Sequence, residues 1–126
     1  MKIVRFKDLD FIPASHEDPK DPGALKKILL KRDDLPNGRI QMINWAKIPI
    51  GKSFAPHYHE SMIEVFIIIS GKVRVKIDQE EATLEKGDTV VAFEKQVHEM
   101  KNISDEEVDY FAMGVVTGEG GKTINI

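Results

Sequence analysis

Short apolar segments of roughly four to eight residues, rich in Val, Ile and Phe, recur along the chain and are separated by Gly, Pro, Asn and Asp. Beyond about residue 32, no window of roughly 12 residues keeps an uninterrupted helical apolar period. Strands of this length, bounded by turn residues, are typical of all-β proteins. The chain has 126 residues, which is the length of a single domain. We therefore expect one all-β domain over residues 1–126.

The clearest predicted strand covers residues 72–77, where apolar residues alternate with cations as they do on a sheet with one solvated face. The sequence also predicts a strand pair, residues 83–84 with 89–93, around a turn at residues 86–88. Residues 110–116 form a late apolar strand in this interpretation.

A turn signal stands at Pro36-Asn37-Gly38, because Asn and Gly tolerate the positive φ of a tight hairpin. This turn is expected to join residues 24–31 with residues 39–48. Residues 24–31 fit either a strand or a short helix, and we favour the strand. Residues 13–23 contain prolines and charges and can bury little, so we expect them to form a surface loop or arm.

Composition excludes several classes of function. There are 18 Lys and Arg against 21 Asp and Glu, a net charge of −3, so the basic field that nucleic-acid binding requires is missing. The longest apolar run, residues 65–69, is far shorter than the roughly 20 residues that cross a bilayer. Residues 1–8 carry charges and lack the apolar stretch of a secretory signal, so we expect a cytoplasmic protein. The chain has no Cys, so any metal must be held by His, Asp or Glu.

A strand over residues 64–69 would be apolar on both faces apart from the carboxylate of Glu64. An antiparallel sheet normally leaves one face in water. We therefore expect a second sheet to cover one side of this strand, and a partner subunit or the N-terminal arm to cover the other. A homodimer is the expected assembly.

Three histidines and one glutamate form the candidate metal site. His57 and His59 would lie on the same face of a strand, with ring nitrogens that can converge on one ion. Glu64, in its apolar strand, needs a compensating cation, which could be a basic residue such as Arg74 or a divalent metal shared with the histidines. His98 can lie on an adjacent strand and complete a set of three imidazoles and one carboxylate.

These residues also carry a family resemblance. The spacing of Gly51, His57, His59, Glu64 and Gly71 resembles the first motif of the cupin superfamily at every defining position. The resemblance is strongest to small single-domain members of the mannose-6-phosphate-isomerase-like (cupin_2 conserved barrel) type.

The second cupin motif is kept less fully. Gly87, His98 and Asn102 match it, but Phe93 and Lys95 stand where the family usually has Pro and Gly. Lys adopts positive φ less readily than Gly, so this substitution bears on the turn before His98.

The resemblance implies an antiparallel double-sheet jelly-roll β-barrel with a metal held inside it. It also implies turn roles for Gly51 and Gly71, a structural role for Asn102, and pairing of two jelly rolls through their sheets. The positions that match the family's metal ligands are His57, His59, Glu64 and His98.

Four protein ligands around a six-coordinate ion leave about two adjacent positions open, which suggests chemistry on a bound small molecule. The expected cofactor is one divalent transition metal per chain, with Mn, Fe or Zn ranked ahead of Ni, Co or Cu. The expected function is a metalloenzyme (dioxygenase, decarboxylase or isomerase) acting on a small anionic, oxygen-rich metabolite with a carboxylate or a sugar-like structure. The alternative is a non-enzymatic protein that binds or senses a small molecule.

Four further residues are candidates for a substrate pocket: Gln96, Met100, Phe66 and Trp45. Alternation from His98 and Glu64 suggests the first three, and the single Trp could roof the cavity, although core packing is the favoured alternative for Phe66, Met100 and Trp45. No general acid or base can be assigned.

His16 is expected to be a surface histidine, and residues 118–123 are expected to form a flexible tail.

Overall fold

The computed structural model describes residues 1–118 and 122–126, which form two antiparallel β-sheets and no α-helix. The six-stranded sheet has the order β1 (Ile12–Pro13), β2 (Leu25–Lys31), β3 (Ile40–Ile48), β10 (Val108–Val116), β5 (Met62–Ser70) and β8 (Thr89–Ala92). The five-stranded sheet has the order β11 (Thr123–Asn125), β4 (His57–His59), β9 (His98–Asn102), β6 (Lys72–Ile77) and β7 (Glu80–Glu85). Two short 3₁₀ helices are η1 (Phe6–Asp8) and η2 (Arg32–Asp34). The expected all-β class is confirmed, and no helix in the described part of the chain is long and apolar enough to cross a membrane.

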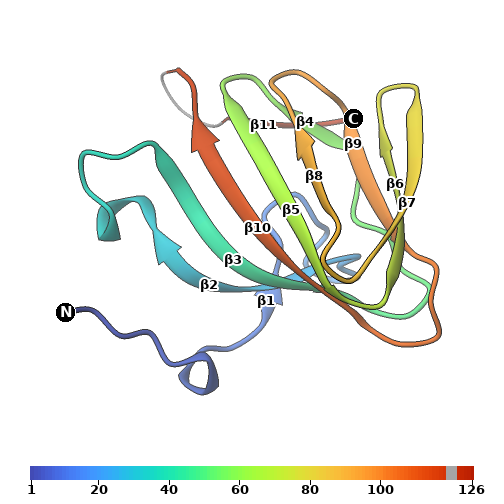
Figure 1. The fold of residues 1–126 in the computed structure, drawn as a ribbon, viewed down its shortest axis with the longest axis horizontal. Coiled ribbons are helices and arrows are strands. Elements are labelled where there is room, and N and C mark those ends of the chain that lie inside the picture. The colour runs from blue at the N-terminus through green and yellow to red at the C-terminus, as the bar shows by residue number, and fades with distance from the viewer. Residues whose placement is uncertain (119–121) are drawn as a thin grey trace.

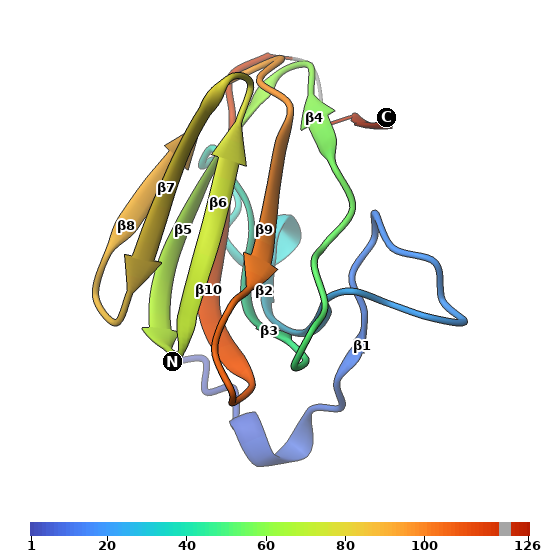
Figure 2. The ribbon, with the colours of Figure 1, turned by 90° about the vertical axis from the view of Figure 1, so that its right-hand side faces the viewer.

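The two sheets pack against each other and enclose the core (Figures 1 and 2). Figure 2 looks onto the five-stranded sheet, with the six-stranded sheet behind it. Along β10, and along β5 as far as Ile69, buried residues alternate with more exposed ones, as expected for strands with one face in a core. The largest fully buried apolar side chains come from both sheets and from the loop before β4: Phe54, Ile48, Ile68, Met100, Val73 and Val108. Each contributes roughly 1.5–3 kcal/mol by leaving water.

The segment that fitted either a helix or a strand is the strand β2, which pairs antiparallel with β3 as the turn signal predicted. Asn37 in that signal has a φ of 68°. The connection is longer than a two-residue hairpin, because η2 lies between the two strands.

The expected pairing of residues 83–84 with 89–93 is wrong. β7 and β8 are the edge strands of different sheets, and the turn between them carries the chain from one sheet to the other. The turn is tied to β5: the Gly87 amide donates to the Ile68 carbonyl at 2.7 Å, and the Ile68 amide donates to the Asp88 carbonyl at 3.0 Å. A turn signal marks a chain reversal, but it does not specify which strand the chain joins next.

The outer face of β5 is only half-buried, and Ile67 on this face is 40% exposed. The N-terminal segment covers a different part of the same sheet, where the Phe6 ring packs edge-on against Trp45 at 5.2 Å between centroids. Among the described residues, no second layer covers the outward side chains of β5.

The tail expected at residues 118–123 falls partly outside the described residues, which omit 119–121. Thr123, at its end, belongs to β11 and pairs with His59 of β4. This end of the segment is therefore part of the five-stranded sheet.

Candidate metal centre

Three strands bring the four predicted ligands together. His57 and His59 are the first and last residues of β4, so alternation points both imidazoles to the inner face. His98 begins β9 and is the direct antiparallel partner of His57, and Glu64 projects inward from β5 in the opposite sheet. One ligand atom from each of the four buried residues lies within 4.8 Å of all the others.

The spacing of these atoms suits a transition metal. Metal–nitrogen bonds of about 2.1 Å put ligand atoms on opposite sides of an ion about 4.2 Å apart. The observed spread of up to 4.8 Å is close to that value, so small side-chain rotations would close the group around an ion. The set of three imidazoles and one carboxylate suits Mn, Fe, Co, Ni, Cu and Zn.

Each imidazole has its outer nitrogen occupied by an oxygen partner. His57 Nδ1 lies 2.7 Å from the Ala55 carbonyl oxygen, and His98 Nδ1 lies 2.9 Å from that of Gln96. His59 Nδ1 lies 3.1 Å from the Thr123 hydroxyl. Such outer partners fix the ring orientation of metal-binding histidines and leave Nε2 free to bind.

The inner nitrogens converge on the carboxylate. His59 Nε2 lies 3.0 Å and His98 Nε2 3.2 Å from Glu64 Oε1. His57 Nε2 is buried and has no hydrogen-bond partner among the described residues. A buried nitrogen without a partner is costly unless something occupies it, and a metal ion would.

The shifted pKa values of Glu64 and His57 favour the protonation states that bind a cation. Burial alone would raise the pKa of Glu64, but hydrogen bonds from His59 and His98 and the charges on their rings hold it well below its usual range. Burial, with repulsion from His16 and His98, lowers the pKa of His57 to about 3. At neutral pH the site therefore offers a carboxylate and at least one neutral imidazole, which are the protonation states that bind metals.

The turn before His98 keeps its shape without the family's usual glycine. Lys95 adopts a φ of 64°, the left-handed conformation that Gly would take most easily. Its amide donates to the His59 carbonyl at 2.7 Å, so this turn is tied directly to β4. The Gln96 side chain accepts a hydrogen bond from the Phe93 amide at 2.8 Å within the same turn.

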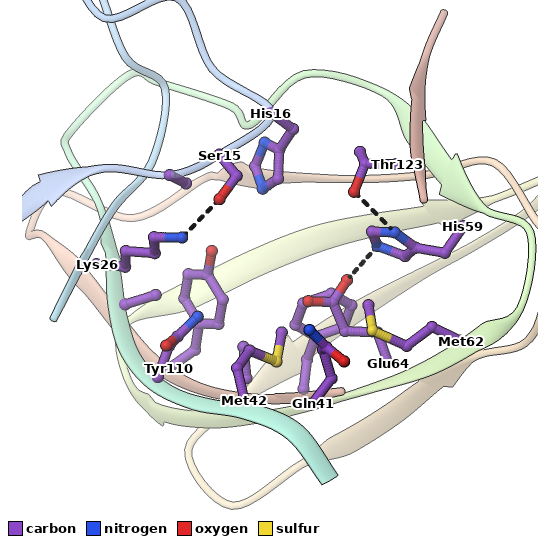
Figure 3. A pocket seen from close by; sticks show the side chains of 15 residues that line it. Ser15, His16, Lys26, Gln41, Met42, His59, Met62, Glu64, Tyr110 and Thr123 are labelled. Carbon is purple, nitrogen blue, oxygen red and sulfur yellow. Dashed lines mark hydrogen bonds and ion pairs between the residues drawn. The ribbon is translucent and has the colours of Figure 1, made fainter. Parts of the chain in front are cut away.

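A cavity of about 270 Å³ adjoins the cluster (Figure 3). His59 and Glu64 contribute to its wall, whereas His57 and His98 lie behind them, fully buried. The N-terminal segment contributes Ser15 and His16 to the wall between Lys26 and His59. The other lining residues come mainly from β2, β3, β5 and β10: Ala14, Lys26, Gln41, Met42, Asn44, Ala46, Met62, Phe66, Tyr110, Ala112 and Thr123.

Of the four predicted pocket residues, Phe66 lines this cavity. Met100 points inward but is fully buried in the core beneath it. Gln96 belongs to the turn before β9, where alternation along the strand no longer applies, and it borders a different hollow beside β6 and β8. Trp45 lies on the outer face of β3, where its indole donates to Asp109 at 3.1 Å.

His16 is not the isolated surface histidine expected from the sequence. Its ring stacks on His57 with 4.0 Å between centroids and an interplanar angle of 17°. Its Nδ1 lies 2.6 Å from Glu17, whose carboxylate also accepts hydrogen bonds from the amides of Gly23 and Ala55. Burial opposes ionisation of Glu17, but these hydrogen bonds lower its pKa. The sequence around His16 carries no local signal for its contact with His57, which lies 41 residues further along the chain.

Lys26 and Tyr110 are two further pocket residues that the sequence interpretation missed. Burial, with the charges of Glu64 and Glu17, raises the pKa of Tyr110 far above its usual range, so the phenol stays protonated. Two consecutive lysines in one strand must point to opposite faces, and this was the available signal for Lys26.

Residues 44–114 match the model of the cupin domain family. The chain is 27% identical over 84 residues to the uncharacterised protein MJ1618 of Methanocaldococcus jannaschii, a match that covers 67% of this chain and 66% of that protein.

Solved structures share the fold at low sequence identity. A predicted oxalate decarboxylase from Thermotoga maritima superposes with a TM-score of 0.80 at 19% identity, over 91% of this chain and 99% of that one. A sugar phosphate isomerase of the cupin superfamily from Silicibacter pomeroyi has a TM-score of 0.74 at 17% identity, over 92% of this chain and 76% of that one. At these identities the likeness establishes the fold alone.

Proposed function

This chain belongs to the cupin domain family, and on that premise we propose that it is a metal-dependent enzyme acting on a small anionic, oxygen-rich metabolite. The protein ligands would be His57, His59, Glu64 and His98. We rank Mn, Fe and Zn ahead of Ni, Co and Cu, because the donor set suits all six and availability then decides occupancy.

The observation that carries this proposal is the contact between the ligand cluster and a cavity. Two ligands, His59 and Glu64, form part of the wall of a space of about 270 Å³. Structural metal sites are closed by their protein ligands, whereas catalytic sites keep a position for water or substrate. A cluster that adjoins a cavity corresponds to the second kind.

A bound divalent metal would supply Lewis acidity toward substrate oxygens, or a centre for oxygen chemistry if it is redox-active. The chain's own residues bind and orient the substrate. The single carboxylate leaves a local charge near +1 around a divalent ion, which favours anionic oxygen ligands. The buried phenol of Tyr110 stays protonated and can donate a hydrogen bond into the cavity.

The reaction belongs to the dioxygenase, decarboxylase or isomerase types in our proposal. Fold likeness does not choose among them, since the similar structures include a predicted oxalate decarboxylase and a sugar phosphate isomerase.

Coordination chemistry tests whether the site is open. Protein loaded with Co²⁺ should show a visible absorption spectrum that changes when oxalate or malonate is added, because these chelators would occupy the positions facing the cavity. The control is Glu64→Gln, which should take up Co²⁺ more weakly. A Co²⁺ spectrum that no small carboxylate alters would mean a closed site and contradict the proposal, whereas carboxylate binding with no turnover of any substrate would favour the non-enzymatic alternative.

We also propose that the protein is a single domain that forms a homodimer through the outer face of its six-stranded sheet. Apolar side chains lie in register across this face: Phe111 faces Ile67, and Val65 faces both Met113 and Val91. Ile67 is 40% exposed, and a second copy would cover it. The cytoplasmic location expected from the sequence stays a prediction.

A further inference from the structure

Two adjacent lysines of β2 have opposite surroundings. Lys27 points to the outer face, where its ammonium donates to the Phe6 carbonyl at 2.9 Å and lies 3.7 Å from the centre of the Phe6 ring. Lys26 points into the cavity, where its ammonium donates to the Ser15 hydroxyl at 2.6 Å. These contacts explain the position of Lys27, but they leave the charge of Lys26 without a counter-ion.

No carboxylate of the described residues lies within 4.0 Å of the Lys26 ammonium. Partial burial lowers the pKa of Lys26, while the charge of Glu64 across the cavity opposes this effect. The hydrogen bond to Ser15 is exposed, so water reaches this ammonium, and an anion that enters the cavity would meet the only ammonium among the lining residues. The cavity therefore provides an anion position at Lys26.

This position is separate from the metal cluster. Figure 3 shows Lys26 on one side of the cavity, and His59 with Glu64 on the other. In the sheet, β3 and β10 lie between β2 and β5. The backbones of the two outer strands are thus three strand spacings apart, on the order of 14 Å. The side chains of Lys26 and Glu64 both reach into the cavity from these strands, so a ligand that contacts both ends spans only part of this distance.

The wall between the two ends offers room and a polar group. Lys26 pairs with Ala46, which pairs with Tyr110, and Asn44 pairs with Ala112. The two alanines have small side chains, so this part of the cavity wall leaves room for a ligand. Asn44 Oδ1 is buried and has no hydrogen-bond partner among the described residues, so it can accept a hydrogen bond from a ligand hydroxyl.

We infer that Lys26 binds a second acidic group of the substrate, so that the substrate is a two-ended acid that meets the metal cluster at one end and Lys26 at the other. This inference rests on the function proposed above. A carboxylate fits the second position better than a phosphate, because the residues lining the cavity offer one ammonium and no Arg. The substrate class is a hydroxy or oxo acid of low molecular mass with a carboxylate at its far end.

Matched pairs of acids test this assignment. Malate and 2-hydroxybutyrate share a metal-chelating 2-hydroxy acid group and differ in ending with a carboxylate or a methyl group; 2-hydroxyglutarate and 2-hydroxyvalerate form a longer pair. Dissociation constants are measured by calorimetry on Zn²⁺-loaded wild type, Lys26→Met, Lys26→Arg and Lys76→Met. The last variant removes one positive charge from an exposed position on β6.

For at least one pair, wild type should bind the carboxylate-ended acid about 10- to 100-fold more tightly than the methyl-ended acid, as expected for a charged hydrogen bond. Lys26→Met should remove this preference while keeping the affinity for the methyl-ended acid, which also shows that the variant is folded. Lys26→Arg should keep part of the preference, and Lys76→Met all of it.

Zinc-loaded protein that binds both members of each pair equally, or none of the four acids, overturns the Lys26 assignment and leaves the metal site intact. A preference that survives in Lys26→Met also overturns it. Protein that takes up no metal overturns the proposed function itself, and zinc content measured on the same samples separates this failure from the others.

Discussion

The ring nitrogens of His59 lie between two oxygens, the Thr123 hydroxyl on one side and the Glu64 carboxylate on the other. Outer partners of metal-binding histidines typically contribute 10- to 100-fold to metal affinity. We expect Thr123→Val to weaken metal binding about tenfold and Thr123→Ser to keep it, as measured by competition with a chromophoric chelator. Equal affinities in wild type and Thr123→Val would show that the hydroxyl does not orient this ligand.

His57 makes the metal-free protein sensitive to mild acid. Its pKa is about 3 in the folded chain against an ordinary value of 6.5, so between these values the unfolded chain binds a proton that the folded chain does not. The part of the free energy of unfolding that depends on His57 is therefore highest above pH 6.5. It decreases as the pH falls below that value, by at most about 1.4 kcal/mol per pH unit.

Denaturant unfolding of chelator-treated protein between pH 7 and pH 5 measures this effect. This range lies above the ordinary pKa of Glu64, whose depressed pKa costs stability only at lower pH. His57→Gln should have a flatter stability profile than wild type over the range. Parallel profiles would contradict the assignment of the acid sensitivity to His57.

Alternation in a strand placed His57 and His59 on one face, and the spacing of the cupin motifs added Glu64 and His98 to the candidate ligands. Alternation could not place Gln96, since β9 begins at His98 and Gln96 lies in the preceding turn. It could not assign Trp45 to the outer face either, because alternation separates two faces without saying which one is inside.

At the level of elements, the two glycines of the first motif, Gly51 and Gly71, are required for different physical reasons. Gly71 has a φ of +83°, and a Cβ there would lie 2.7 Å from Val108 Cγ2. Gly51 has a φ of +75°, but a Cβ there would meet nothing within 4 Å. Gly71→Ala combines backbone strain with a clash between the β5–β6 turn and β10.

We expect Gly51→Ala to lower the free energy of unfolding by about 1–2 kcal/mol, from left-handed strain alone. Gly71→Ala should cost a further 1–3 kcal/mol or so, from overpacking. Thermal or denaturant unfolding of both variants checks the difference. Equal losses would mean that Val108 moves aside and the contact is not restrictive.

Local signals predicted most strands, including β2 and its pairing with β3. They did not predict that β7 and β8 join different sheets, because pairing depends on which edge is free once the sheets have formed. Lys95 shows the converse: its side chain disfavours positive φ, yet the hydrogen bond from its amide to His59 of β4 accompanies that conformation.

For the whole molecule, the outer face of the six-stranded sheet predicts the assembly. A glutamate at Ile67 would place a charge in the middle of the proposed interface, so Ile67→Glu should convert a dimer into a monomer in light scattering coupled to gel filtration. Ile50→Glu is the control, since Ile50 is 59% exposed and follows β3 instead of lying on this face. Wild type that elutes as a monomer at all concentrations would contradict the dimer.

The N-terminal segment is the part of the molecule that sequence reasoning placed least well. It brings His16 onto His57 and Ser15 onto Lys26 over distances in sequence that no local pattern can specify. Contacts of this kind become visible only when the two sheets and the cavity between them are known.

Metal content measured by mass spectrometry tests the central claim most directly, using protein purified without a tag or chelator and, in parallel, protein reloaded at pH 8. Wild type should carry close to one Mn, Fe, Zn or related ion per chain, and His98→Ala should lose most of it. His16→Ala should retain the metal, because His16 stacks on the cluster without belonging to it. Wild type that holds no metal even after reloading, or a His98→Ala variant that holds as much as wild type, would contradict the account.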